Sequence, residues 1–132
     1  MSISHFEIIL YVSDQNNSRD FYTKILQKEP DLDVPGMTEY TLADNLKLGL
    51  MPEEGIVNIL KDKTPHPKSG NGIPRCELYL LVDNIVESYE AALKAGAKEI
   101  SSIEERDWGD IVGYVSDFDG HVIAFAKKID SI

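Results

Sequence analysis

The chain has little cysteine, few basic residues and no long apolar run. Cys76 is the one cysteine among 132 residues, which excludes an intramolecular disulfide and a cysteine-rich zinc site. Lys and Arg number 13 against 23 Asp and Glu, and the net charge of −10 disfavours nucleic acid and anionic membranes as partners. No apolar run approaches the roughly 20 residues of a membrane span, and the first residues lack the pattern of a signal peptide. We therefore expect a cytoplasmic protein.

The length and composition indicate one globular domain. The hydrophobic fraction is 42% and the charged fraction 27%, both close to the globular norm. A chain of this length can bury roughly two-thirds of its unfolded surface. Residues 1–66 and 67–132 each carry a net charge of −5, so the acidic excess is not a tail. We expect a core that needs no disulfide or structural metal.

Hydrophobic patterning predicts one order of elements twice. In the first half, strands are predicted at 6–12, 38–42 and 46–51, and an apolar stripe at 21–26 predicts a helix after the first strand. In the second half, Asn84 and Glu87 resemble a capping box that opens a helix. Strands are predicted there at 77–82, 100–103, 110–116 and 122–127.

Several segments are expected to carry no special function. Proline and glycine are frequent between the halves, so residues 53–74 are predicted to form a linker with little regular structure. Cys76 is predicted to be a small hydrophobe in a strand, and residues 104–107 a solvated charged turn. His66 and His121 are predicted to be solvated surface histidines.

The two halves also align residue by residue. At an offset of 70, Glu7 falls on Glu77 and Leu10 on Leu80; at an offset of 75, Gly49 falls on Ala124. The same element order on both sides of one linker indicates a tandem βαβββ duplication.

Two motifs at the ends of this repeat resemble a known superfamily. The run Val12-x-Asp14-x3-Ser18-x2-Phe21-Tyr22-x3-Leu26 resembles the opening of glyoxalase, bleomycin-resistance and extradiol-dioxygenase proteins, the vicinal oxygen chelate superfamily. Trp108-Gly109 and the run from Gly113 to His121 resemble its closing segment, with Phe118 where the superfamily often has proline.

The resemblance implies an α+β fold of tandem βαβββ modules. Their curled mixed sheets form a cup with the helices outside, usually in a homodimer. It implies one glyoxalase-like domain over 1–132, with module one at 1–52, the linker at 53–74 and module two at 75–132. Alternation along the strands then predicts which side chains face the cup and a small-molecule ligand. They are Glu7, Ile9, Tyr11, Lys47, Gly49, Met51, Glu77, Tyr79 and Ala124, with Trp108 and Tyr114 as aromatic walls.

Metal-dependent members supply four ligands, which correspond here to Glu7, Gly49, Glu77 and Ala124. Gly49 and Ala124 have no donor side chain, and two carboxylates do not make a closed transition-metal site. His5 lies on the same strand face as Glu7 and is a conceivable substitute. We predict that the protein binds no metal and no cofactor, which disfavours lyase or dioxygenase chemistry that uses a metal as Lewis acid.

Glu7 and Glu77 leave three functional alternatives. Each can be paired with a basic side chain, for which Lys47 and Arg75 are available. They can make an acidic cup for a cationic or amine-bearing ligand, or one of them can act as a general base without a metal. We predict a metal-free homodimer that sequesters a small organic molecule, as bleomycin-resistance proteins do. The alternative is a lyase, isomerase or epimerase of the same superfamily.

Overall fold

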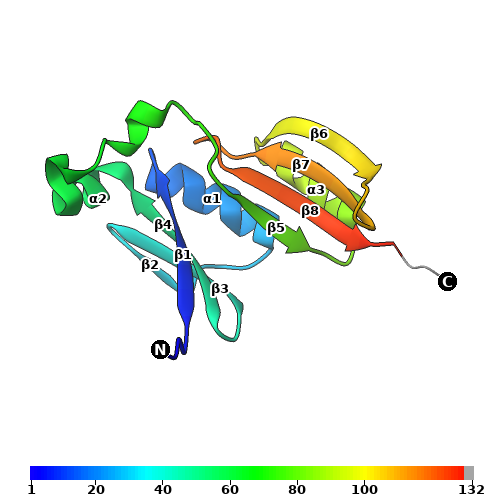
Figure 1. Ribbon diagram of the computed structural model, residues 1–132, viewed down its shortest axis with the longest axis horizontal. Helices are drawn as coiled ribbons and strands as arrows, with labels where there is room; N and C mark the ends of the chain where they lie inside the picture. Colours follow the sequence, from blue (N-terminus) through cyan, green and yellow to red (C-terminus); the bar gives the residue numbers. More distant parts are fainter. Residues whose placement is uncertain (130–132) are drawn as a thin grey trace. The chain divides into compact units, whose positions relative to one another are not determined.

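Each half of the chain forms a four-stranded mixed sheet with a helix packed against it (Figure 1). The computed structural model describes residues 1–129. The chain divides into two compact units, the first Met1–Asn71 and the second from Gly72 onwards. The predicted α+β class, with two repeated sheets and their helices, is confirmed.

The first unit contains four strands and one helix in the predicted order, followed by a helical segment. They are β1 (Phe6–Val12), α1 (Gln15–Leu26), β2 (Leu32–Val34), β3 (Met37–Ala43), β4 (Leu46–Pro52), α2 (Glu53–Leu60) and the 3-10 turns η1 (Lys61–Lys63) and η2 (Pro67–Gly70). The strand order is β1-β4-β3-β2, and β1 pairs with β4 in parallel while the other pairs are antiparallel.

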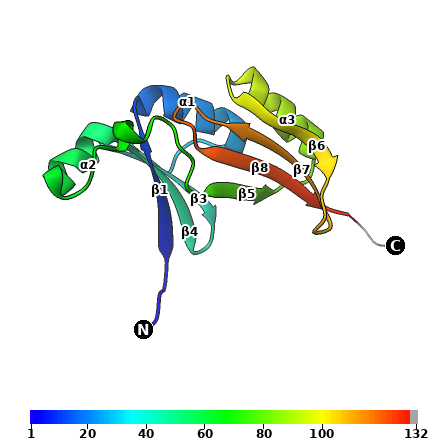
Figure 2. The same ribbon diagram turned by 45° about the horizontal axis from the view of Figure 1, so that its top comes forward.

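The second unit repeats this arrangement, and Figure 2 shows its helix along one face of the sheet. Its elements are β5 (Glu77–Leu81), α3 (Ile85–Lys94), β6 (Lys98–Glu105), β7 (Asp110–Ser116) and β8 (Val122–Lys128). The strand order is β5-β8-β7-β6, with β5 and β8 parallel. The first and last strands of each unit are therefore neighbours, which brings side chains some 40 residues apart onto one face.

Local signals fix where the helices begin and end. The Asp14 carboxylate accepts the Asn17 N–H at 2.9 Å, and the Asn84 side chain accepts the Glu87 N–H at 3.1 Å. Such caps satisfy backbone donors that a first turn leaves unpaired. Gly96 follows the C-cap of the helix at Ile85–Lys94 with a φ of 108°, a conformation that glycine adopts without strain.

Apolar side chains between each helix and its sheet form the two cores. In the first unit, Leu48 and Leu50 of β4 are fully buried against α1, where Phe21 and Tyr22 are equally buried. Burial of each such side chain contributes about 2 kcal/mol. In the second unit Tyr89 of α3 lies directly over Gly113 of β7, with no room for a Cβ at that glycine. Small and large residues thus interdigitate across the helix–sheet contact.

The predicted linker is more regular than its composition suggested. Residues 53–60 form α2, and η1 and η2 follow it. The prediction of little regular structure was wrong because proline is compatible with the start of a helix. Pro52 lies at the N-cap of α2, and Pro67 lies in the first turn of η2. None of the helices within residues 1–129 is long and apolar enough to cross a bilayer.

Two smaller predictions were also wrong. Cys76 is exposed and precedes β5 instead of lying within it. His121 is half-buried beside the buried Asp117 and is not a solvated histidine, whereas His66 lies at the surface as predicted, with 35% of its side chain exposed, and is hydrogen-bonded. His66 accepts the Lys68 N–H and lies 3.0 Å from Glu54, and His121 Nδ1 lies 2.8 Å from Asp117 Oδ2. The His66–Lys68 and His121–Asp117 bonds are local and depend on turn geometry, whereas the His66–Glu54 contact joins residues 12 positions apart.

Candidate functional site

The face of the first sheet that points away from α1, here called the first far face, carries the predicted residues of β1 and β4. Leu10 and Val12 are buried on the α1 side, whereas Ile9 and Tyr11 between them are 41% and 37% exposed. The β1–β4 register places three pairs of predicted residues side by side: Glu7 with Lys47, Ile9 with Gly49 and Tyr11 with Met51. Strand alternation assigned these residues to their face correctly.

Gly49 is buried beneath the Glu7 carboxyl. A Cβ at residue 49 would collide with Oε2 of Glu7 and would lie 3.3 Å from both Ile9 Cγ1 and Met37 Sδ. Oε2 of Glu7 is shielded from solvent and has no hydrogen-bond partner among the described residues. The Glu7 side chain therefore fills the place where the superfamily resemblance puts a second ligand.

Glu39 of β3 completes this cluster, and sequence reasoning missed it. Glu39 pairs with Gly49 in the β3–β4 register, which brings its carboxylate beside Glu7. Burial, then hydrogen bonding to Glu39 and its negative charge, raise the pKa of Glu7, and the Lys47 ammonium opposes them. Lys47 forms its ion pair with Glu39, at 3.6 Å, and not with Glu7. The Glu7 carboxyl therefore keeps its proton to a higher pH than an ordinary glutamate does.

The corresponding face of the second sheet, here called the second far face, carries the predicted aromatic residues. Ala124 of β8 pairs with Tyr79 on one side and Tyr114 on the other, and it is fully buried between them. Glu77 is exposed at the start of β5, and among residues 1–129 no ion pair to it is present. The suggested pairing of Glu77 with Arg75 is therefore absent from the described structure.

A directed hydrogen-bond chain joins Trp108 to Tyr79 and Asp110. The Trp108 indole N–H donates to the Tyr79 hydroxyl at 2.9 Å, and that hydroxyl donates to Asp110 Oδ2 at 2.5 Å. Burial and the Asp110 carboxylate raise the pKa of the Tyr79 hydroxyl, which keeps it protonated at neutral pH. Asp110 was not singled out from the sequence, although strand alternation places it on the same face as Tyr114.

Arg106 is the other residue of this face that sequence reasoning misjudged. Its guanidinium lies 5.2 Å from the centre of the Tyr114 ring and donates to Ser101 Oγ, at 3.0 Å, and to the Val112 carbonyl. Its side chain is 19% exposed, so the prediction of a fully solvated turn was wrong here. Irregular pairing between β6 and β7 leaves carbonyl groups that Arg106 satisfies.

These residues do not fit the metal that the superfamily resemblance implies. Gly49 and Ala124 supply no donor atom, and Lys47 places a cation beside the Glu7 and Glu39 carboxyls. Within residues 1–129, the group of three potential ligands whose donor atoms converge within 4.8 Å is Asp117, Asp119 and His121. That group surrounds the β7–β8 turn and includes neither Glu7 nor Glu77.

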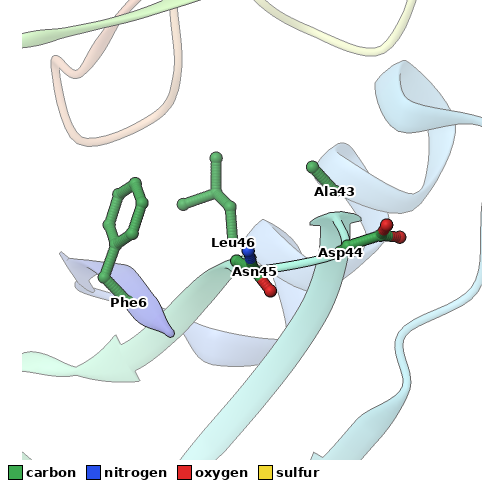
Figure 3. A pocket seen from close by; sticks show the side chains of 5 residues that line it. All are labelled: Phe6, Ala43, Asp44, Asn45 and Leu46. Carbon is green, nitrogen blue, oxygen red and sulfur yellow. The ribbon is translucent and has the colours of Figure 1, made fainter. Parts of the chain in front are cut away.

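A shallow hollow lies at the β3–β4 turn of the first unit (Figure 3). Phe6 and Leu46 extend from neighbouring strands into it, and Asp44 and Asn45 of the turn complete its rim. It contains none of the residues predicted from the sequence to bind a ligand.

Comparison with known proteins identifies the family. Residues 6–130 match the family model of the glyoxalase-like domain. The chain belongs to this glyoxalase-like family. An uncharacterized protein of Mycobacterium bovis, Mb0911c, is 29% identical over 126 residues, which cover 93% of this chain and 82% of that protein.

Solved structures share the glyoxalase-like fold at low sequence identity. A glyoxalase-related enzyme from Fulvimarina pelagi is 21% identical with a TM-score of 0.79, covering 92% of this chain and 86% of that chain. A glyoxalase/bleomycin resistance protein/dioxygenase family enzyme from Burkholderia phytofirmans PsJN is 14% identical with a TM-score of 0.76. The match covers 98% of this chain and 100% of that chain. The superfamily suggested by the sequence motifs is confirmed, and these structures establish the fold alone.

Proposed function

We propose that this glyoxalase-like protein binds a small organic molecule on the far faces of its sheets without using a metal. The observation that carries the proposal is the Glu7 carboxyl lying over Gly49. Gly49, at one metal-ligand position of the superfamily, has no side chain. Glu7 stands at another such position, and its carboxyl fills the space above the glycine and contacts Glu39. Lys47 neutralises that carboxyl pair from within the protein, which leaves little reason for a divalent cation to bind there.

Exposed rings and carboxylates define the ligand chemistry that we propose. Tyr11 on the first far face and Tyr79 on the second are 37% and 38% exposed, and Trp108 is 57% exposed. Aromatic faces beside carboxylates favour cationic or amine-bearing organic molecules. The net charge of −10 adds a long-range attraction for them. We further propose that the protein acts by sequestration as a homodimer, as the sequence analysis predicted.

One observation favours a second candidate, proton transfer without a metal. The raised pKa of Glu7 beside Glu39 is a property expected of a general acid or base. Such a group would suit an isomerase or epimerase, which moves a proton on its substrate. In that case the ligand would be converted and not merely held.

Metal analysis and ligand screening together test the proposal. Protein purified without chelators is analysed for Ni, Zn, Fe and Mn, and thermal shift is measured for aminated aromatics and cationic glycopeptides with and without EDTA. We expect far less than one ion per chain and ligand-induced stabilisation that EDTA leaves unchanged. Stoichiometric metal that is lost in Glu7→Gln would overturn it. Light scattering that gives the mass of one chain would overturn the homodimer.

A turnover assay separates the two candidates. Each stabilising molecule is incubated with the protein and followed by NMR for chemical change or for exchange of its carbon-bound hydrogens with deuterium. Unchanged molecules support sequestration. Exchange that disappears in Glu7→Gln would establish proton transfer in its place.

A further inference from the structure

We infer that the second far face recognises a flat aromatic ring that carries an N–H donor, with the ring stacked on Trp108 and the donor bound by Asp110. This inference rests on the proposed function and specifies its ligand class. Three features of the second unit carry it: an exposed and hydrogen-bonded indole, a hydrogen-bond chain with one possible direction, and another ring whose face is already occupied.

Trp108 is exposed, and its indole N–H is hydrogen-bonded to Tyr79. It lies in the turn between β6 and β7, where the Arg106 N–H donates to the Asp110 carbonyl at 2.8 Å and the Gly109 N–H donates to the Arg106 carbonyl at 3.3 Å. The Ile129 N–H binds the Gly109 carbonyl from the other side, at 2.9 Å. The ring remains 57% exposed although its N–H is bonded to Tyr79. A ring held this way loses little entropy when a ligand stacks on it.

The direction of the hydrogen-bond chain determines which groups a ligand must bring. An indole nitrogen can only donate, so the Tyr79 oxygen accepts its hydrogen, and the single Tyr79 hydrogen goes to Asp110 Oδ2. A carboxylate can accept about four hydrogen bonds. At the end of the chain Asp110 therefore offers acceptor capacity, and it selects ligands that have a donor.

The ring of Tyr114, another aromatic residue of this face, already has a partner. Arg106 covers Tyr114 at 5.2 Å, and its own donors bind Ser101 and the carbonyl groups of Ser102 and Val112. A ligand cation at Tyr114 would compete with this internal guanidinium. Trp108, which is more exposed than Tyr79, is consequently the ring on which we expect a ligand to stack, and Asp110 is the polar group that gives the interaction its selectivity.

A matched pair of compounds tests the inference. 3-Aminoquinoline and 3-methylquinoline have the same ring and nearly the same size, both are neutral at pH 7.5, and the amino compound alone carries N–H donors. Trp108 is the one tryptophan of the chain, so its indole N–H gives a single side-chain signal in a proton–nitrogen NMR spectrum. We expect both compounds to shift this signal and the amino compound to bind about tenfold more tightly, the usual gain from a hydrogen bond to a charged acceptor.

Three variants assign the effect to its residues, with affinities measured by calorimetry. Trp108→Ala is expected to weaken the binding of both compounds. Asp110→Asn is expected to remove most of the preference for the amino compound. Phe6→Ala is the matched control, because Phe6 is exposed to nearly the same extent, 56%, but lies in the hollow of the first unit. It is expected to leave both affinities unchanged. Spectra of the unbound variants verify that each one is folded.

The outcomes separate this inference from the proposed function. Equal affinities for the two quinolines, or a loss of binding in Phe6→Ala comparable to that in Trp108→Ala, would overturn the inference. So would binding that shifts other resonances and leaves the Trp108 signal in place, although the proposed function would then survive. Absence of binding by every compound of the broader screen would overturn the proposed function itself.

Discussion

The Glu7 carboxyl occupies the space that a side chain on residue 49 would need. The two residues lie on neighbouring parallel strands. Gly49 pairs with Ile9, two residues after Glu7, so the Glu7 side chain can fold across the glycine. A glycine within a strand normally weakens it. Here it admits a buried carboxyl, and that carboxyl contacts Glu39 because Glu39 pairs with the same glycine from the other side.

Replacing Glu7 with glutamine should stabilise the protein at neutral pH. A carboxyl whose pKa is raised above its usual 4.5 in the folded state contributes stability below about pH 4.5, and that contribution is lost as the pH rises through the raised pKa. Glutamine stays neutral and can donate to Glu39 at every pH. We expect Glu7→Gln to be more stable than the unchanged protein at pH 7.5 and equally stable at pH 4, measured by urea unfolding.

Glu77→Gln is the control for this experiment, since Glu77 occupies the equivalent position of the second unit but is exposed. Its unfolding free energy should follow that of the unchanged protein at both pH values. A Glu7→Gln variant that is less stable at pH 7.5 than at pH 4, relative to the unchanged protein, would contradict the raised pKa of Glu7.

Adding a methyl group at residue 49 should be costly only while Glu7 is present. In Gly49→Ala the new Cβ must displace the Glu7 carboxyl from Glu39, whereas Ile9 and Met37 need to move by only tenths of an ångström. We expect Gly49→Ala to lose about 1 kcal/mol alone, and to be neutral or stabilising in a Glu7→Ala background. A double-mutant cycle by urea unfolding measures this coupling. Additive effects would mean that the glycine is needed for another reason.

The strands and helices were largely predictable because their signals are local. The strand predicted at 110–116 is β7, Asp110–Ser116, and the expected cap at Asn84 is present. Alternation then assigned Ile9 and Tyr11 to the exposed face and Leu10 to the core. In α2, however, local proline content was misleading, because the helix gains its stability from contacts with β1 and β4.

The partners within the candidate sites were not predictable in the same way. Glu39 reaches Glu7 only through the register of β4 between β1 and β3, and Asp110 meets Tyr79 across 31 residues of sequence. Register depends on turn geometry and on the packing of both sheet faces. The sequence motifs could therefore indicate which positions lack metal ligands, but not which side chains replace them.

Two glycine-to-alanine substitutions should have opposite effects on stability. A Cβ at Gly113 would approach the Tyr89 ring to 2.6 Å and Ile103 to 2.8 Å, so the α3–sheet contact would have to open. We expect Gly113→Ala to lose about 2 kcal/mol by overpacking. Gly55 lies inside α2, and a Cβ there would meet Met51 at an ordinary 3.7 Å. Gly55→Ala should therefore gain about 0.8 kcal/mol from helix propensity.

Thermal unfolding of both variants checks this pair of expectations. A loss of similar size at both positions would indicate that α2 does not tolerate the added methyl group, and would contradict the packing argument for Gly113. The hydrogen bond from the Tyr89 hydroxyl to Glu99, 2.6 Å long, gives a further measure of the packing in Gly113→Ala. The pKa of Tyr89, raised to about 12 by burial and by Glu99, should fall in Gly113→Ala as the ring becomes solvated.

The side chain of Gln15 should stabilise the β2–β3 turn. Its side-chain amide donates to the Val34 carbonyl at 2.8 Å and to Thr38 Oγ1 at 2.9 Å, and its oxygen accepts the Gly36 N–H at 2.9 Å. Gln15→Glu keeps the acceptor but places a negative charge against the Val34 carbonyl, so it should lose about 2 kcal/mol, as Gln15→Ala should. Hydrogen exchange tells the two apart: the Gly36 amide should stay protected in Gln15→Glu and exchange freely in Gln15→Ala. Equal exchange of that amide in both variants would mean that the turn is held by its backbone alone.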